Sequence, residues 1–364
     1  MNQAKLVKPV TLVKLVKGLA HAGLLAAAMT AWPAQSAPPT QPAQPIHQIR
    51  AAQPAPIAPA VAPGAHAPME GQADYALQAS ALAPGVWVVE GANADFSRGN
   101  GCNIINTAFI ATGAGVIVIN SGPSRRYGEA LRALIERTTD EPIRELVQLN
   151  LHPDHGLGHQ AFADVPRRAT AATRAGVQRE GRAFEDNLYR LCGAWMAGTT
   201  LLPPDSPLVP GRQRVGRRDL EWIEWQGHTD SDLVLIDHTS GTVFAGGLVF
   251  RQRIPTTPHA RLDEWLRSLD ALQAALPPHA VLVPSHGPVR PDAQALDQTR
   301  SYLHWLQNHL RAAAARGLDM NELLALGLPA PFASWAAADT EYVRNLVHLY
   351  PAFERDALAA RPRP

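Results

Sequence analysis

The segment from residue 150 to residue 159 constrains this chain more than any other part of its sequence. It reads Asn-Leu-His-Pro-Asp-His-Gly-Leu-Gly-His and follows an apolar run, residues 145–149, that predicts a strand. The proline after His152 favours an extended backbone there, and residues two apart in an extended segment share a face. We therefore expect His152 and Asp154 to point one way and His155 to reach a second position.

Imidazole nitrogens and carboxylate oxygens together suit zinc or a neighbouring first-row metal. Neutral histidine and ionised aspartate are the ligand forms that such ions take, and three of them fall within four residues here. The alternative is a solvated polar loop after a strand. The density of the cluster favours a metal site.

The distribution of charge argues against a nucleic-acid partner. All four lysines of the 364-residue chain lie within residues 1–36, which contain no acidic residue and no arginine. Loss of those four positive charges takes the formal net charge from +1 to −3. No basic stripe then remains to neutralise phosphates, so we expect no nucleic-acid partner.

Residues 1–36 have the pattern of a signal peptide. A lysine-bearing region precedes an apolar stretch, residues 18–32, and small residues follow near Ser36. The apolar stretch is shorter than the ~20 residues that a membrane span requires. We expect cleavage, a periplasmic protein and no stable membrane span afterwards; an uncleaved anchor is the alternative.

Residues 37–72 are rich in alanine, proline and glutamine and show almost no periodicity, which predicts a disordered linker. The only two cysteines, Cys102 and Cys192, are 90 residues apart. The periplasm permits a disulfide, but the sequence does not decide between a disulfide and two buried thiols.

The remaining sequence predicts an α/β protein, because short apolar strand patterns alternate with helical spacing. Strands are predicted at residues 86–90, 106–111, 116–119, 146–149, 233–237, 242–245 and 280–284, and helices at 126–139 and 262–276. Helices then dominate, at 293–316, 320–326 and 340–359. This pattern predicts a main domain at residues 73–292 and a C-terminal helical extension at 293–364.

Two further histidines lie beside predicted strands. His228 occurs in Gly-His-Thr-Asp-Ser-Asp before one strand, and His286 occurs in Pro-Ser-His-Gly after another. Ligands gathered from several strand ends are a common way to build a rigid site. Asp232, in the first of these motifs, is expected to hydrogen-bond a ligand histidine or to cap the turn. His159 is expected to have a structural or supporting role.

The order His-x-Asp-His, Gly-His-Thr, Ala-Gly-Gly-Leu-Val-Phe and Pro-Ser-His-Gly resembles the metallo-β-lactamase superfamily of metallohydrolases over residues 82–289. The resemblance implies an αβ/βα sandwich with two packed mixed sheets, outer helices and metals in a cleft at one edge. The helical C-terminal extension would be added to this sandwich.

Four further segments are similar to one subgroup, the quinoprotein relay system zinc metallohydrolases. These segments are residues 122–129, 186–191, 256–259 and 317–320. The resemblance implies a periplasmic protein with a small-molecule substrate. It also implies a functional link to a PQQ-dependent dehydrogenase and a c-type cytochrome.

Carried over residue by residue, the resemblance implies two zinc positions. Their ligands would be Asn150, His152 and His228 at the first position and Asp154, His155 and His286 at the second. Asn150 stands where a histidine is usual and offers only a weak amide oxygen. We therefore expect one tightly bound Zn2+ at the second position and a weakly bound one at the first.

Three other positions depart from the family pattern. Gly247 stands where many members have a bridging aspartate, Asn120 where an aspartate supports the ligand histidines, and Ser285 where glycine is usual. Loss of supporting groups typically costs about 10–100-fold in metal affinity or activity.

The resemblance implies a zinc-dependent hydrolase of an ester, thioester, lactone or amide. Zinc lowers the pKa of bound water toward ~7, and Asp154 is expected to orient that water as the catalytic residue. The subgroup implies a substrate pocket with His259, and with Asn187 and Tyr189 on a lid loop; the alternative is that all three are ordinary helix and loop residues. The alternative is a non-catalytic metal- or ligand-binding protein on the same scaffold.

Overall fold

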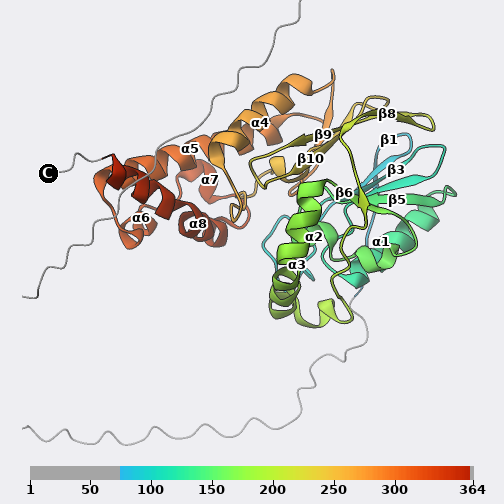
Figure 1. Cartoon of the computed structure of the whole chain (residues 1–364), viewed down its shortest axis with the longest axis horizontal. Helices are drawn as coiled ribbons and strands as arrows, with labels where there is room; N and C mark the ends of the chain where they lie inside the picture. The colour runs from blue at the N-terminus through green and yellow to red at the C-terminus, as the bar shows by residue number, and fades with distance from the viewer. Residues whose placement is uncertain (1–73, 361–364) are drawn as a thin grey trace, which may run out of the picture. The chain divides into compact units, whose positions relative to one another are not determined.

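The structure is a computed structural model that describes residues 74–360. The predicted signal peptide (1–36) and linker (37–72) lie outside the described residues. Two mixed sheets pack face to face with helices outside them, which confirms the sandwich expected from the sequence (Figure 1).

The first sheet has seven strands in chain order. They are β1 (Ser80–Ala83), β2 (Val86–Val89), β3 (Thr107–Ala111), β4 (Val116–Ile119), β5 (Ile143–Val147), β6 (Arg167–Ala169) and β7 (Ser206–Pro207). Strands β1 to β4 pair antiparallel, and β4 to β7 pair parallel. Strand β5, in the parallel half of the sheet, leads directly into the segment that carries the histidine cluster.

The second sheet has five strands in the order β12-β11-β10-β9-β8. Their bounds are β8 (Gly211–Val215), β9 (Arg218–Trp225), β10 (Asp232–Asp237), β11 (Thr242–Phe244) and β12 (Val281–Val283). All pairs are antiparallel except β11 and β12, which are joined through helix α4 (Leu262–Ala275). A crossover helix is the usual connection between parallel neighbours.

The core between the sheets follows from side-chain alternation. Successive residues of a strand face opposite sides, so Val86 and Val88 of β2 point inward. They meet Leu233 and Leu235 of β10 in the same buried cluster. The outer face of the first sheet is covered by helix α1 (Arg125–Thr138).

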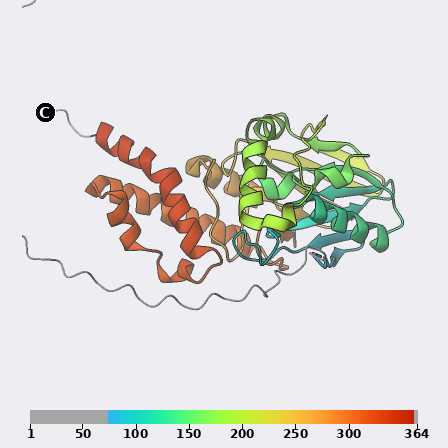
Figure 2. The same cartoon turned by 90° about the horizontal axis from the view of Figure 1, so that it is seen from below.

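The predicted C-terminal helical region is present. It comprises α5 (Gln294–Arg316), α6 (Met320–Leu326), α7 (Ala330–Ala333) and α8 (Ala338–Ala359). These helices share one buried cluster with α4, and both views show them gathered beyond one end of the sheets (Figures 1 and 2). Among residues 74–360, every helix is too short or too polar to span a lipid bilayer.

A long helix, α3 (Ala171–Cys192), follows β6 and was not predicted from the sequence. Its last residue, Cys192, forms a disulfide with Cys102 in the loop after β2. The structure thereby decides between the two alternatives that the sequence left open. The bond joins α3 to the loop that contributes Phe96 and Ile104 to the cavity described below.

Candidate metal centre

The histidine cluster lies just beyond the end of β5. His152 is extended (φ −66°, ψ 150°), as the following proline predicts. Residues Pro153–Gly156, however, form one helical turn, α2, so the expected extended path through Asp154 is wrong. Proline suits the first position of a helix because its φ is already helical, and the chain therefore turns at Pro153.

His152 and His228 meet side by side. Nδ1 of His152 lies 3.1 Å from Nε2 of His228, and the two rings are nearly perpendicular. His228 belongs to the loop between β9 and β10. Its ring packs against Phe250 and Trp265, which fixes its orientation.

Asp154 and His286 form a second pair. Nε2 of His286 lies 3.5 Å from Oδ2 of Asp154. Nδ1 of His286 donates to the carbonyl oxygen of Ile104 at 2.8 Å, which leaves the Nε2 lone pair directed at Asp154. Such hydrogen bonds fix the tautomer of histidines that bind metals.

Asn120 supports His155 in a similar way. Its Oδ1 accepts from the backbone N–H of Leu149 at 3.0 Å and lies 3.1 Å from Nδ1 of His155. Because this oxygen can only accept, Nδ1 of His155 carries the hydrogen and Nε2 keeps its lone pair. A neutral amide therefore stands in the supporting place of the usual aspartate.

The spacing within each pair suits zinc. Two ligands at tetrahedral zinc, with bonds of about 2.0–2.1 Å, lie about 3.3 Å apart. The distances of 3.1 Å and 3.5 Å fall on either side of that value. Within residues 74–360, however, no group of three or more His, Cys, Asp or Glu is close enough to hold one ion. The structure thus brings the expected ligands together as pairs and not as sets of three.

Asn150 and Gly247 occupy the rest of the first position. Oδ1 of Asn150 accepts from the backbone N–H of His152 at 3.0 Å, so this oxygen is already engaged. Its buried Nδ2 faces Gly247, where a Cβ would lie 2.4 Å from Nδ2 and 2.2 Å from the His228 ring. There is no room for an aspartate at residue 247. The first position therefore offers two imidazoles only.

Burial keeps the histidines neutral. It lowers the pKa of His155 to about 3, and it lowers the pKa values of His152, His228 and His286 well below 6.5. Neutral imidazole is the form that binds metals. Burial also raises the pKa of Asp154 to about 6, which leaves it largely ionised at neutral pH.

A cavity of about 300 Å³ opens over Asp154 and His286. Its walls come from four parts of the chain that converge there. They include Phe96 and Ile104 after β2, Phe184, Asn187, Arg190 and Leu191 of α3, Arg253, Thr256 and Pro258 before α4, and Glu341, Arg344 and His348 of α8. Apolar side chains and three arginines therefore surround the space above the second pair, together with the acidic Glu341.

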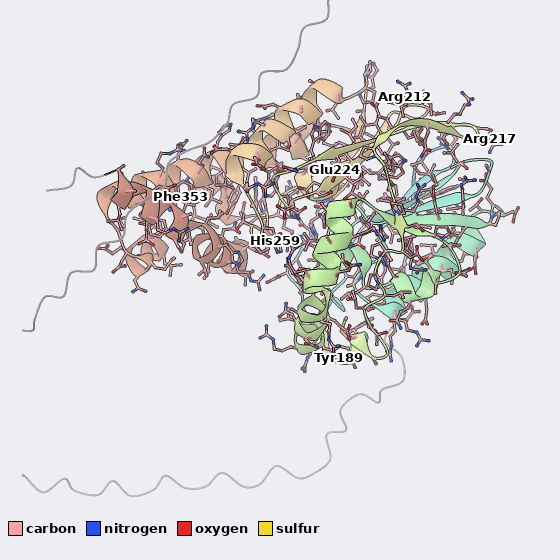
Figure 3. All side chains as sticks on the ribbon, viewed as in Figure 1. Tyr189, Arg212, Arg217, Glu224, His259 and Phe353 are labelled. Carbon is pink, nitrogen blue, oxygen red and sulfur yellow. A yellow bond between two sulfur atoms is a disulfide. The ribbon has the colours of Figure 1, made fainter. Side chains whose placement is uncertain are left out.

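The residues expected on a lid loop lie on α3 instead. Asn187 lines the cavity, whereas Tyr189 is 40% exposed and is not among the lining residues. Figure 3 shows Tyr189 near one end of α3 and His259 away from that end. His259 contacts His152, with Nδ1 3.1 Å from Nε2 of that ring.

Two other expectations are settled by hydrogen bonds. Oδ2 of Asp232 accepts from the backbone N–H groups of His228 and Thr229, so this carboxylate caps the turn. His159 is buried, with Nδ1 donating to the carbonyl oxygen of Leu202 at 2.9 Å, which is a structural role.

Sequence reasoning did not find the arginines and acids of the cavity. Arg253, Glu341 and Arg344 lie in no recognisable motif, and their meeting depends on how α8 docks. The only available signal for Glu341 was its place in a predicted helix. Glu180, which contacts His259, was also not predicted as a site residue, because it lies in α3, a helix that was not predicted.

The sequence profile of the metallo-beta-lactamase superfamily matches residues 100–286. No curated protein matches the sequence. Among solved structures, a metallo-beta-lactamase from Pontibacter korlensis is 22% identical with a TM-score of 0.52, covering 63% of this chain and 99% of that one. FIM-1 from Pseudomonas aeruginosa, in its mono-zinc form, is 18% identical with a TM-score of 0.52, covering 64% and 96%.

These structural likenesses show the fold. The matched profile spans more than half of the chain and includes the histidine cluster, His228, Gly247 and His286. The chain belongs to the metallo-beta-lactamase superfamily.

Proposed function

We propose that the chain is a periplasmic zinc-dependent hydrolase of a small ester, thioester, lactone or amide. The observation that carries this proposal is the pair formed by Asp154 and His286 at the floor of a cavity of about 300 Å³. Side chains that could hold a metal thus lie where a small molecule can reach them.

In this proposal the pair Asp154 and His286 holds one zinc, with His155 moving in as the third ligand when the metal binds, and His152 and His228 offer a weaker position. Zinc, when bound, polarises a carbonyl oxygen and lowers the pKa of its water. The hydrogen bonds from His286 to Ile104 and from His155 to Asn120 keep one lone pair of each ring available. Asp154 is buried and ionised near neutral pH, so its carboxylate can accept a hydrogen bond from the attacking water.

The walls of the cavity would bind the substrate. Phe96, Phe184 and Leu191 present apolar surface, and Arg190 and Arg344 present cations. Arg344 is paired with Asp95 and Glu341, whereas Arg190 contacts only Asn187 among the described polar groups. Residues from α3 and α8 together exclude solvent from the floor, which strengthens electrostatic interactions there.

The periplasmic location and the link to a PQQ-dependent dehydrogenase and a c-type cytochrome are also proposals. They are supported by the N-terminal export pattern and by the four segments similar to quinoprotein relay system metallohydrolases. A disulfide between the only two cysteines is typical of proteins from oxidising compartments.

A second candidate is a non-catalytic metal- or ligand-binding protein. It is favoured by the environment of Gly247, where Asn150 and His228 fill the space that a bridging aspartate would need. In that case the cavity binds a ligand but the centre does not turn it over.

Zinc content and hydrolysis distinguish the two candidates. We expect the mature protein, purified after zinc-supplemented growth, to hold about one zinc per chain and to hydrolyse generic aryl esters or lactones. His155→Ala should lose both zinc and turnover, while Arg182→Ala, on the exposed face of α3, should keep both. Less than about a tenth of a zinc per chain, or unchanged zinc in His155→Ala, would favour the second candidate.

A further inference from the structure

A chain of hydrogen-bonded side chains runs from α3 into the metal centre. Oε2 of Glu180 lies 2.7 Å from Nε2 of His259, and Nδ1 of His259 lies 3.1 Å from Nε2 of His152. The other nitrogen of His152 faces His228 at 3.1 Å. His259 and His152 therefore each use both ring nitrogens.

The carboxylate sets the direction of the hydrogens. An ionised Glu180 can only accept, so Nε2 of His259 must carry a hydrogen. In a neutral ring Nδ1 of His259 is then the acceptor, and Nε2 of His152 must donate to it. His152 is left with a lone pair on Nδ1, the atom that faces His228.

Aromatic packing holds the hydrogen-bonded side chains Glu180, His259 and His152 in place. The ring of Phe184, one turn of α3 beyond Glu180, meets the rings of His152 and His259 nearly edge-on, at centroid distances of 6.3 Å each. Oε1 of Glu180 is bound by exposed Arg179, which leaves Oε2 for His259. Glu180 and His259 are both only partly exposed, so water competes weakly for these contacts.

We propose that Glu180 and His259 are positioning residues that hold His152 as the tautomer able to bind a metal through Nδ1. This inference rests on the proposed zinc site. It assigns His259 to the support of a ligand rather than to substrate contact. It also ties the first metal position, which lacks a third imidazole at Asn150, to the helix that forms a cavity wall.

The opposite direction of the hydrogen bond between His259 and His152 predicts a different tautomer of His152. If Nδ1 of His259 instead donates, His152 accepts at Nε2 and carries its hydrogen on Nδ1. His152 could not then ligate through Nδ1. The tautomer of His152 is therefore the quantity to measure.

Two substitutions at residue 259 separate the acceptor from the bulk of the ring. His259→Asn keeps an oxygen near the place of Nδ1, whereas His259→Leu keeps volume without an acceptor. We expect His259→Leu to weaken binding of the more weakly held Zn2+ or Co2+ by about 10–100-fold, and His259→Asn to stay within about threefold of the wild type. Glu180→Ala should fall between them, and Arg182→Ala should match the wild type.

The measurements are chelator competition with zinc, the visible absorption of the cobalt form, and thermal unfolding of the metal-free protein. Equal affinities for His259→Leu and the wild type, or equal losses in His259→Leu and His259→Asn, would overturn the proposal.

Imidazole nitrogen shifts from NMR of the metal-free protein provide an independent readout. We expect His152 to be protonated on Nε2 in the wild type and to lose that preference in His259→Leu. A wild type that binds no metal but keeps this tautomer would refute the zinc site while retaining the positioning role. A His152 protonated on Nδ1 would refute the positioning role itself.

Discussion

Arg253 and Glu341 are 88 residues apart in the chain and meet as a buried ion pair beside the candidate metal centre. Nη2 of Arg253 lies 3.5 Å from Oε1 of Glu341, and the two side chains are 1% and 3% exposed. Nε of Arg253 also donates to the carbonyl oxygen of Ala94. The pair thus joins the segment after β11, the loop after β2 and helix α8 at one point on the cavity wall.

Glu341→Gln should be strongly destabilising, because it leaves the Arg253 charge buried without a full counter-charge. Removing one partner of a buried pair typically costs about 3–5 kcal/mol in the free energy of unfolding. Urea denaturation measures this loss. The same change at exposed Glu129, which pairs with Arg125, should cost less than about 1 kcal/mol. Similar losses at both positions would contradict the role given to the buried pair.

Gly247→Ala should lower both stability and metal affinity. The added Cβ would lie 2.2 Å from the His228 ring, which cannot move freely because Phe250 and Trp265 pack against it. Overpacking of this kind costs about 1–3 kcal/mol, measured by chemical denaturation. Gly99→Ala is the control, since its Cβ would meet only Ser97 Oγ at 3.7 Å. An unchanged free energy of unfolding in Gly247→Ala would show that the His228 ring can move away from the added Cβ.

Replacing Cys102 and Cys192 by serine should lower the free energy of unfolding by about 4 kcal/mol, because the bond closes a loop of roughly 90 residues. A reductant should produce a similar loss in the wild type and none in the double variant. Thermal melts with and without reductant test this. A wild type that is insensitive to complete reduction would mean that the unfolded chain gains little freedom from the lost cross-link.

Stability should also depend on pH through His159. Burial lowers the pKa of His159 to about 4, below its ordinary value of 6.5. Between pH 6.5 and pH 4 the unfolded chain therefore binds a proton at His159 that the folded chain does not bind. The free energy of unfolding is lost as pH falls over this range. The loss attributable to this group is up to about 3 kcal/mol.

His159→Asn isolates that contribution, because an asparagine amide can still donate to the carbonyl oxygen of Leu202 but does not titrate. The difference in the free energy of unfolding between the wild type and His159→Asn should change over this pH range. A constant difference would show that His159 titrates alike in both states.

The sequence predicted the strands that lie in the core. Residues 116–119 and 233–236 are continuous apolar runs, and they lie in β4 and β10. It did not predict α3, where Val177 is the only large apolar residue before Phe184 and Gly181 interrupts the pattern. A Cβ at Gly181 would lie 2.6 Å from Leu201, so tertiary packing selects glycine there against its low helix propensity.

The candidate site was predictable only in part, for a similar reason. His152, Asp154, His228 and His286 lie in short motifs beside strands, and the structure brings them together in two pairs. Glu341 has no signal beyond its place in a predicted helix, because its position beside Arg253 depends on the docking of a helix distant in sequence. The turn at Pro153–Gly156 departs from the prediction, because proline favours an extended backbone for His152 but itself begins a helical turn.

Helix α8 contributes Glu341, Arg344 and His348 to the cavity, so the last part of the chain is a component of the binding compartment. A fragment that stops just after His286 would keep all twelve strands of the two sheets and every expected ligand. It would nevertheless present those ligands to open solvent on one side. The shortest part of the protein that can enclose a small molecule is therefore longer than residues 100–286, the segment that the family profile matches.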